Sequence, residues 1–351
     1  MTEVENAFQP WSGAGAIVLL AAAAATAALI ALLRPVLRQY ALARPNPRSS
    51  HKVPTPQGGG IAVIAVTIAT AAIALYSLPL PAGDAHQLAW VFAATSMLAI
   101  VGAIDDVRVL EAAPRLVLQA LAVGIVLAAL PADMRVIQVL PWWAERALIL
   151  IGGVWFVNLV NFMDGIDWMT VAEVVPITAG LVLFGELGAL SPQPTLVALA
   201  LCGAMIGFAP FNRPVARLFL GDVGSLPIGL LLGWLLLQLA GNGHLAAALL
   251  LPLYYLADTT VTLLRRLIKG EPVTQAHRSH FYQRAIDYGF SVGEIIVYVF
   301  SLNVALVGLA TASILMSPGL IRAGPLATGC VLVQDKSRVT NSCPSGVCAL
   351  R

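Results

Sequence analysis

Long apolar segments separated by short polar connections run along most of the chain. We expect ten of them to be membrane-spanning helices, and several run a little short of the roughly 20 residues that cross a bilayer. They lie at about 14–33, 58–78, 88–104, 116–131, 147–163, 171–189, 194–210, 226–240, 245–264 and 292–316. The pattern therefore predicts an all-α fold, a polytopic integral membrane protein with about ten transmembrane helices. No basic residue precedes the first segment and no obvious cleavage site follows it, so we interpret it as a span and not as a signal peptide.

The composition agrees with a membrane protein and excludes one class of partner. Apolar residues make up 59% of the 351 residues and charged residues only 11%, which no soluble domain of this length needs. The net charge is only +2, and no basic patch interleaved with aromatic residues accompanies it, so we expect no nucleic acid partner. The expected surroundings are a lipid bilayer, and a homodimer is left open by the sequence.

The distribution of Lys and Arg predicts the orientation. The connections that follow odd-numbered spans hold 14 of the 20 basic residues, and the opposite side holds the other 6. Because basic residues gather in cytoplasmic loops, this asymmetry places those connections in the cytoplasm and both termini outside.

The chain is expected to form one membrane domain, residues 1–316, followed by a polar tail of unknown role, residues 317–351. The tail holds Cys330, Cys343 and Cys348, where one disulfide with one thiol left over is an option on the exterior. Cys202 lies within a predicted span, where we expect it to serve packing.

Five aspartates lie where predicted spans meet cytoplasmic connections. They are Asp105, Asp106, Asp164, Asp167 and Asp222. Ionisable residues at membrane depth are costly, so they indicate a functional site. Carboxylates gathered at one membrane face suit a divalent cation and a substrate that carries phosphate.

Two of these groups have simpler alternatives. Asp105 and Asp106 follow an apolar run directly, and acids commonly end a span at the water interface. An adjacent carboxylate raises the pKa of its neighbour, however, and such a pair is useful as a base beside a metal. In Phe219-Leu-Gly-Asp222-Val-Gly-Ser225, glycines flank an acid at the start of a span. This pattern suits a helix N-terminus whose free N–H groups face an anion, and an ordinary N-cap is the alternative.

Four polar residues recur at three-residue spacing: Asn158, Asn161, Asp164 and Asp167. On a helix these positions drift slowly around one face and predict a polar stripe on an apolar span. A single Asn there is typical of a helix–helix hydrogen bond, but four in register favour a site. Gly165 lets the backbone break or approach a ligand closely.

A basic loop and a deep acid complete the candidates. Residues 265–291 contain His277, Arg278, His280 and Arg284, which predict a cationic clamp on phosphate, with lipid headgroup contacts as the alternative. Asp258 lies roughly 10 Å from the cytoplasmic end of its span, at 1.5 Å per residue. We expect it to pair with a nearby basic residue, Arg265 or Arg266, and not to take part in chemistry.

These motifs, in this order, resemble the polyprenyl-phosphate N-acetylhexosamine-1-phosphate transferase superfamily. The resemblance covers about residues 44–290 and includes a Pro- and Gly-rich first loop, residues 48–60. It implies a helical membrane enzyme that moves an N-acetylhexosamine-1-phosphate from a UDP-sugar to undecaprenyl phosphate. It also implies a site on the cytoplasmic face of the bacterial inner membrane that uses Mg²⁺, with Mn²⁺ as a substitute.

The resemblance also implies residue roles. Asp222 is similar to the principal metal ligand, with Asn161 as its companion. Catalytic roles are implied for Asp105 and Asp106, which activate the lipid phosphate, for Asp164 and Asp167 next to the nucleotide, and for His277 and His280 near the diphosphate. Substrate contacts are implied for Lys52, Asn212, Phe219, Arg278 and Arg284. The chemistry agrees, because a phosphate that attacks a diphosphate needs its charge neutralised.

The loop His277-Arg-Ser-His280-Phe-Tyr-Gln-Arg284 resembles the enzymes that start O-antigen, common-antigen or teichoic-acid chains. The phospho-MurNAc-pentapeptide transferases of peptidoglycan synthesis, the alternative within the superfamily, typically show three successive histidines there. Trp168 is a departure, because the superfamily usually has Gly after the equivalent of Asp167, and it leaves the sugar specificity open.

Two other classes fit less well. A CDP-alcohol phosphatidyltransferase needs Ala-Arg after its Asp-Gly pair, whereas Asp164-Gly165 is followed by Ile-Asp-Trp-Met. A cation-coupled transporter places its acids near the bilayer midplane at broken helices, whereas these acids lie at one interface.

Overall fold

The computed structural model describes residues 13–43, 54–78, 85–108, 110–271 and 278–316. Its elements, in chain order, are α1 (Gly13–Tyr40), β1 (Leu42–Ala43), β2 (Thr55–Pro56), α2 (Gly59–Ser77), α3 (Ala85–Val107), α4 (Ala112–Ala129), α5 (Trp142–Met163), α6 (Met169–Glu186), α7 (Pro192–Asn212), α8 (Asp222–Gly241), α9 (Leu245–Leu250), α10 (Leu253–Ile268), α11 (Phe281–Asp287) and α12 (Val292–Leu315). The two short strands pair antiparallel. The predicted all-α polytopic architecture is confirmed, and the tail after residue 316 lies outside the described residues.

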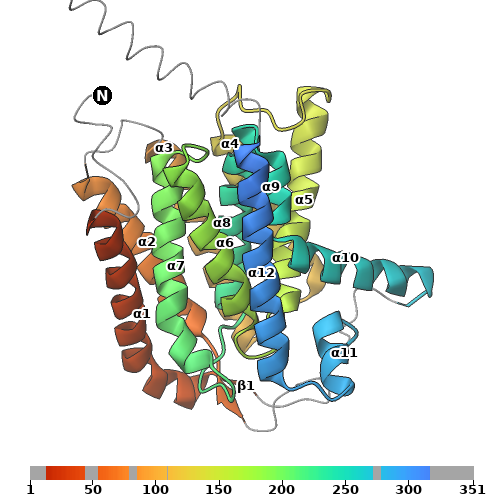
Figure 1. The fold of residues 1–351 in the computed structure, drawn as a ribbon. Helices are drawn as coiled ribbons and strands as arrows, with labels where there is room; N and C mark the ends of the chain where they lie inside the picture. The colour runs from red at the N-terminus through yellow and green to blue at the C-terminus, as the bar shows by residue number, and fades with distance from the viewer. Residues whose placement is uncertain (1–12, 44–53, 79–84, 109, 272–277, 317–351) are drawn as a thin grey trace, which may run out of the picture.

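The number of spans differs from the prediction at one segment. Among the described residues, nine helices are long and apolar enough to cross a membrane: α1 to α8 and α12. The predicted span 245–264 is instead divided into α9 and α10 at Leu251–Pro252. Proline has no N–H to continue the helical ladder, so the chain can turn there. Figure 1 shows α10 leaving the bundle sideways.

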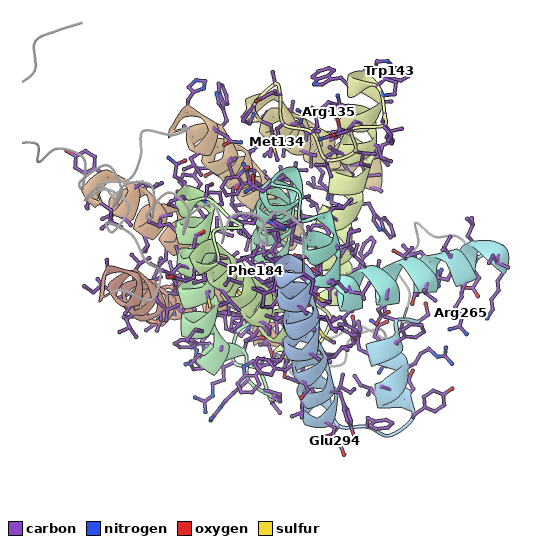
Figure 2. All side chains as sticks on the ribbon, turned by 45° about the horizontal axis from the view of Figure 1, so that its top comes forward. Met134, Arg135, Trp143, Phe184, Arg265 and Glu294 are labelled. Carbon is purple, nitrogen blue, oxygen red and sulfur yellow. The ribbon has the colours of Figure 1, made fainter. Side chains whose placement is uncertain are left out.

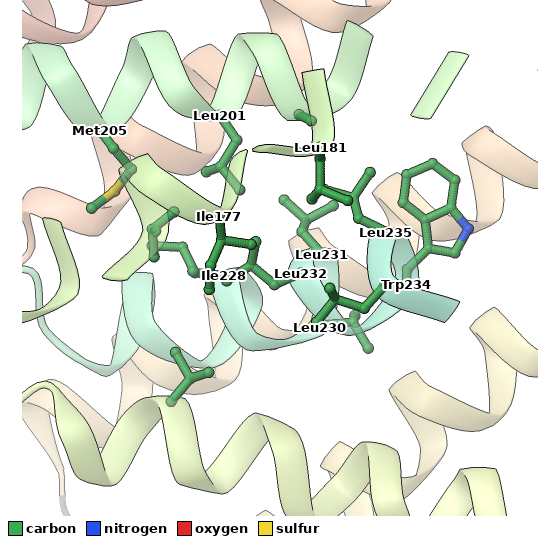
Figure 3. Close-up of a cluster of buried hydrophobic side chains, with 14 of the residues drawn as sticks. Ile177, Leu181, Leu201, Met205, Ile228, Leu230, Leu231, Leu232, Trp234 and Leu235 are labelled. Atoms are coloured by element: carbon green, nitrogen blue, oxygen red, sulfur yellow. The ribbon is translucent and has the colours of Figure 1, made fainter. Parts of the chain in front are cut away.

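The centre of the bundle is formed by α7 and α8. In the apolar 18-residue stretch of each helix, 78% of the residues of α7 and 83% of those of α8 are buried, against 22% for α1. Around them, α8 packs against α2, α3, α5 and α9, and α7 packs against α1, α2 and α6. Side chains from α6, α7 and α8 interlock in the core, among them Leu181, Leu201 and Leu231 (Figure 3). A helix that is apolar on all sides belongs in such a central position.

The loop between α4 and α5 lies at the end of the bundle opposite the start of α12 and is held by several hydrogen bonds. Glu145 is fully buried and accepts hydrogen bonds from the N–H groups of Val136 (2.6 Å) and Ile137 (2.8 Å) and from the Arg135 guanidinium. Arg135 and Trp143 lie at this end and Glu294 lies at the other (Figure 2). The loop thus marks the face that the charge distribution predicts to be external.

Glycines let α2 and α3 touch the first turn of α8. A Cβ on Gly60 would lie 2.2 Å from the Cα of Gly224, and one on Gly102 would lie 2.2 Å from the carbonyl oxygen of Asp222. Close backbone approach through small residues is a common way for helices to pack in membranes. The start of α8 is therefore held at a fixed place between two neighbouring helices.

We expect Gly102→Ala to separate α3 from α8 and to destabilise the protein by about 1–3 kcal/mol, the usual range for overpacking. Gly124→Ala is the matched control, because nothing lies within 4 Å of the position its Cβ would take. Thermal unfolding of both variants in the same detergent would check this. Equal melting temperatures for the two variants would contradict the close contact.

Candidate active site

The candidate metal ligands meet where α5 ends and α8 begins. Asp222 is the first residue of α8. The Asn161 amide nitrogen, on α5, donates to Asp222 Oδ1 at 2.8 Å and to Ser225 Oγ at 2.9 Å. The Asp105 carboxyl, from the end of α3, lies within hydrogen-bonding reach of the Asp222 carboxyl. Three helices thus bring two acids and one amide to one point.

Asp106 fixes the start of α8. Its carboxylate accepts from the backbone N–H of Asp222 at 2.9 Å and of Val223 at 3.1 Å. Gly221 has φ +78°, and a Cβ there would lie 2.5 Å from Asp106 Oδ2. The sequence predicted that these N–H groups face an anion, and the structure supplies that anion from the chain itself. Asp106 therefore caps α8 from a neighbouring helix.

Asp105, the other member of the acid pair, is held by a different set of contacts. Its Oδ1 accepts from the N–H of Leu110 at 2.6 Å, and its Oδ2 forms an ion pair with Arg115 at 3.0 Å. Only 9% of the residue is exposed. Both oxygens of this carboxylate are thus engaged by groups of the chain, which gives it a fixed position beside Asp222.

The predicted polar stripe is only partly a helix face, because α5 ends at Met163. Asn158 donates to Gln119 on α4 (2.5 Å) and to Val154 (2.8 Å), which is the helix–helix hydrogen bond named as the alternative. Asp164 follows the helix and accepts from the Thr170 hydroxyl. Burial raises the pKa of Asp164 to about 7, and the nearby carboxylates of Asp106 and Asp167 act in the same direction.

Asp167 and Asn212 brace the loop that leads to α8. Asp167 Oδ2 accepts from the N–H of Ala216 at 2.9 Å. Asn212 accepts from the N–H of Trp168 at 2.8 Å and donates to the carbonyl of Leu218 at 3.0 Å. Both side chains are buried, so their contacts within the chain hold the loop in place. Their roles toward a nucleotide stay predictions.

Trp168 has a backbone conformation that suits glycine, the residue that the superfamily resemblance predicts at this position. Its φ is +63°, the left-handed region that favours glycine, and it is the only such non-glycine residue among those described. The indole N–H donates to the carbonyl of Ala209 at 2.6 Å. This contact with α7 holds the residue in that conformation.

The first loop joins the site through Phe219. The N–H of Phe219 donates to Pro56 at 2.8 Å, and its carbonyl accepts from Gly59 at 2.9 Å. Gln57 pairs with Phe219 and donates its side-chain amide to the Asp106 carbonyl at 2.6 Å. Phe219 therefore lies close to the acid pair, and its role toward a substrate stays a prediction. Lys52, from the same loop, lies outside the described residues.

The histidine loop reaches the site through α11. Tyr282 donates its hydroxyl to the carbonyl of Phe162 at 3.3 Å, at the end of α5. A Cβ on Gly165 would lie 1.9 Å from that hydroxyl, so the room that Gly165 provides is filled by Tyr282. The ring of His280 stacks on the Tyr282 ring with 5.8 Å between centroids. His280 is thus carried to the same end of the bundle as the acids.

The other basic candidates have partners within the loop. Arg278 forms an ion pair with Asp287 at 3.2 Å, and Arg284 donates to the Tyr288 hydroxyl at 3.2 Å. His277 lies outside the described residues. Asp258 pairs with His280 (3.1 Å between Oδ1 and Nδ1) and not, as expected from sequence, with Arg265 or Arg266. Its burial on the inner face of α10 explains the difference, since both arginines lie beyond it toward the end of the helix.

The chemistry of the donor set can be read from these contacts. In the described part of the chain, no three His, Cys, Asp or Glu side chains form a metal-binding group. The donors that remain for a metal are the adjacent carboxylates of Asp222 and Asp105 and the amide of Asn161. Without a cation between them, the two carboxylates repel each other. Mg²⁺ characteristically uses one or two carboxylates and completes its shell with phosphate oxygens and water. The set fits a metal that arrives with a phosphate substrate.

The sequence is similar to those of several known proteins. Residues 88–240 match the family model described as Glycosyl transferase family 4. The chain is 28% identical to decaprenyl-phosphate N-acetylglucosaminephosphotransferase of Mycolicibacterium smegmatis, covering 81% of this chain and 78% of that protein. It is 24% identical to the probable undecaprenyl-phosphate N-acetylglucosaminyl 1-phosphate transferase of Bacillus subtilis, covering 82% and 84%. It is 32% identical to a phospho-N-acetylmuramoyl-pentapeptide-transferase of Synechococcus sp., covering 58% and 63%.

Proposed function

We propose that this chain, a member of the polyprenyl-phosphate N-acetylhexosamine-1-phosphate transferase superfamily, transfers an N-acetylhexosamine-1-phosphate from a UDP-sugar to undecaprenyl phosphate. The products are undecaprenyl-diphosphate-sugar and UMP, and the reaction starts a cell-envelope glycan. The observation that carries the proposal is the meeting of Asp222, Asn161 and Asp105 at one end of the bundle. The names of the Mycolicibacterium and Bacillus relatives support an amino-sugar phosphate and a polyprenyl acceptor.

The reaction forms and breaks one phosphorus–oxygen bond. An oxygen of the lipid phosphate attacks the phosphorus that carries the sugar, and the bond to the oxygen of UMP breaks. Mg²⁺, or Mn²⁺ in its place, would be held by Asp222 and Asn161, with Asp105 beside them, and would neutralise the charge of the phosphates. Asp106 holds Asp222 in place by capping α8. His280 and Arg278 offer cationic or donor groups to the diphosphate.

The test is a panel of UDP-amino sugars offered to purified protein with undecaprenyl phosphate and Mg²⁺. Release of UMP with a new lipid-linked sugar diphosphate is expected for an N-acetylhexosamine donor. Turnover of UDP-MurNAc-pentapeptide alone would favour the peptidoglycan branch, for which the Synechococcus relative is named. Turnover of neither donor would overturn the proposal.

We further propose that the site faces the cytoplasm of a bacterial inner membrane. In a background without the four native cysteines, a cysteine at Lys269, beside the loop that holds His277, should react only with reagent supplied from the cytoplasm. A cysteine at Gln138, in the loop at the opposite end, is the matched control and should react only from outside. The reverse pattern would overturn the orientation. The homodimer stays a prediction.

A further inference from the structure

Asp258 is a buried acid that none of the motifs contains. Its side chain is fully buried on α10 and faces four donors. Oδ1 lies 3.1 Å from His280 Nδ1 and accepts from the N–H of Phe281 at 3.1 Å and from the Thr262 hydroxyl at 3.2 Å. The Tyr254 hydroxyl lies 3.5 Å from Oδ2. The carboxyl oxygen Oδ1 is thus the common acceptor of several donors, which holds the side chain in one orientation.

This arrangement determines how His280 is presented. Because Oδ1 already accepts from the N–H of Phe281 and from the Thr262 hydroxyl, we take it as the acceptor toward the imidazole too, which places the ring proton on Nδ1. Nε2 then points away from Asp258, as an acceptor when the ring is neutral and as a donor when it is charged. Stacking on Tyr282, with 18° between the ring planes, fixes the plane of the imidazole, and Asp258 fixes its rotation within that plane.

We infer that Asp258 is a positioning residue that acts through His280: it sets the tautomer and orientation of the imidazole and anchors the first turn of α11. The inference deepens the proposed transfer reaction and rests on it. Removing the carboxylate that orients a metal-binding histidine typically lowers activity by about 10- to 100-fold, and we expect a loss of the same order for Asp258 behind His280. If Asp258 only linked α10 to α11, substituting it would lower the stability of the protein, and the effect would be the same with and without His280.

A double-mutant cycle separates these roles. We expect Asp258→Asn to lower kcat by about 10- to 100-fold, with KM for the UDP-sugar changed less than about 3-fold. In a His280→Asn background, the same Asp258 substitution should lower kcat by less than about 3-fold, because residues acting as a unit are not additive. Thr262→Val is the matched control, since it removes another donor to the same oxygen and leaves the histidine untouched. An equal loss with and without His280 would overturn the inference.

A measurement without turnover keeps the inference distinct from the proposed function. The chain has five histidines, and ¹⁵N-histidine spectra of the protein in nanodiscs, at a pH where the imidazole is neutral, report which ring nitrogen carries hydrogen. The signal lost in His280→Asn should show the Nδ1–H tautomer in the wild type and lose it in Asp258→Ala. An Nε2–H tautomer in the wild type would overturn the inference even if the enzyme is active. Failure of every UDP-sugar as donor would overturn the proposed function and leave this result readable.

Discussion

Asp222→Asn is expected to lower turnover by at least about 1000-fold, which corresponds to about 4 kcal/mol of lost transition-state stabilisation, while the protein still folds. The new amide keeps an oxygen for the Asn161 hydrogen bond, which is 2.8 Å long in the wild type. Its nitrogen can donate to the neighbouring Asp105 carboxylate. The geometry therefore survives and only the negative charge that holds the metal is lost.

Melting temperatures give this prediction a second readout. Without metal, the wild type holds two adjacent carboxylates, so Asp222→Asn should melt at the same temperature or higher. Added Mg²⁺ should raise the melting temperature of the wild type and not that of the variant, because a ligand stabilises only the state that binds it. Ser225→Ala, which removes the second acceptor of the Asn161 amide without changing any charge, is the control and should keep most of the activity. More than about a tenth of wild-type turnover in Asp222→Asn would contradict the metal assignment.

The sequence predicted most spans correctly because long continuous apolar runs in a chain of this composition form membrane-spanning helices. It failed at 245–264, where the break at Pro252 divides α9 from α10. Proline alone was no reliable signal, because Pro176 and Pro227 lie inside α6 and α8 without ending them. What distinguishes α10 is its amphipathic composition, with Arg265 and Arg266 in its last turn.

The gathering of the acids at one face was predictable because the alternating topology brings the C-terminal ends of α3 and α5 and the N-terminal end of α8 to the same face. Their individual partners were not, because these come from elements far apart in the chain. Asp106 caps a helix that begins 116 residues later, and Tyr282 reaches back 120 residues to Phe162. Asp258 carried a signal, since a buried acid within an apolar segment needs a partner, but the sequence alone favoured the nearer arginines over His280.

The acid pair is the remaining question of mechanism, and we expect Asp105 to position the site and not to act as a base. By resemblance its role is to activate the lipid phosphate. In the structure, however, its two oxygens already accept from Leu110 and Arg115. A phosphate monoester has its second pKa near 6, so most of the lipid phosphate is dianionic at pH 7 and does not need a strong base. Neutral pH therefore leaves little proton transfer for Asp105 to perform.

Asp105→Asn should accordingly lower kcat by about 100-fold or more and leave the acid limb of the pH–rate profile in place. The limb then belongs to the lipid phosphate, with a midpoint near pH 6. If Asp105 is the base, the limb belongs to the enzyme, and the residual activity of the variant should no longer fall at low pH. Asp106→Asn is the companion variant: it places an amide nitrogen against the N–H of Asp222 or Val223 and should cost about 1–3 kcal/mol of stability. Asp105→Asn likewise places its amide nitrogen against the N–H of Leu110 or the Arg115 guanidinium, so both variants should lose stability. The acid limb of Asp105→Asn is therefore the readout that separates a base from a positioning residue.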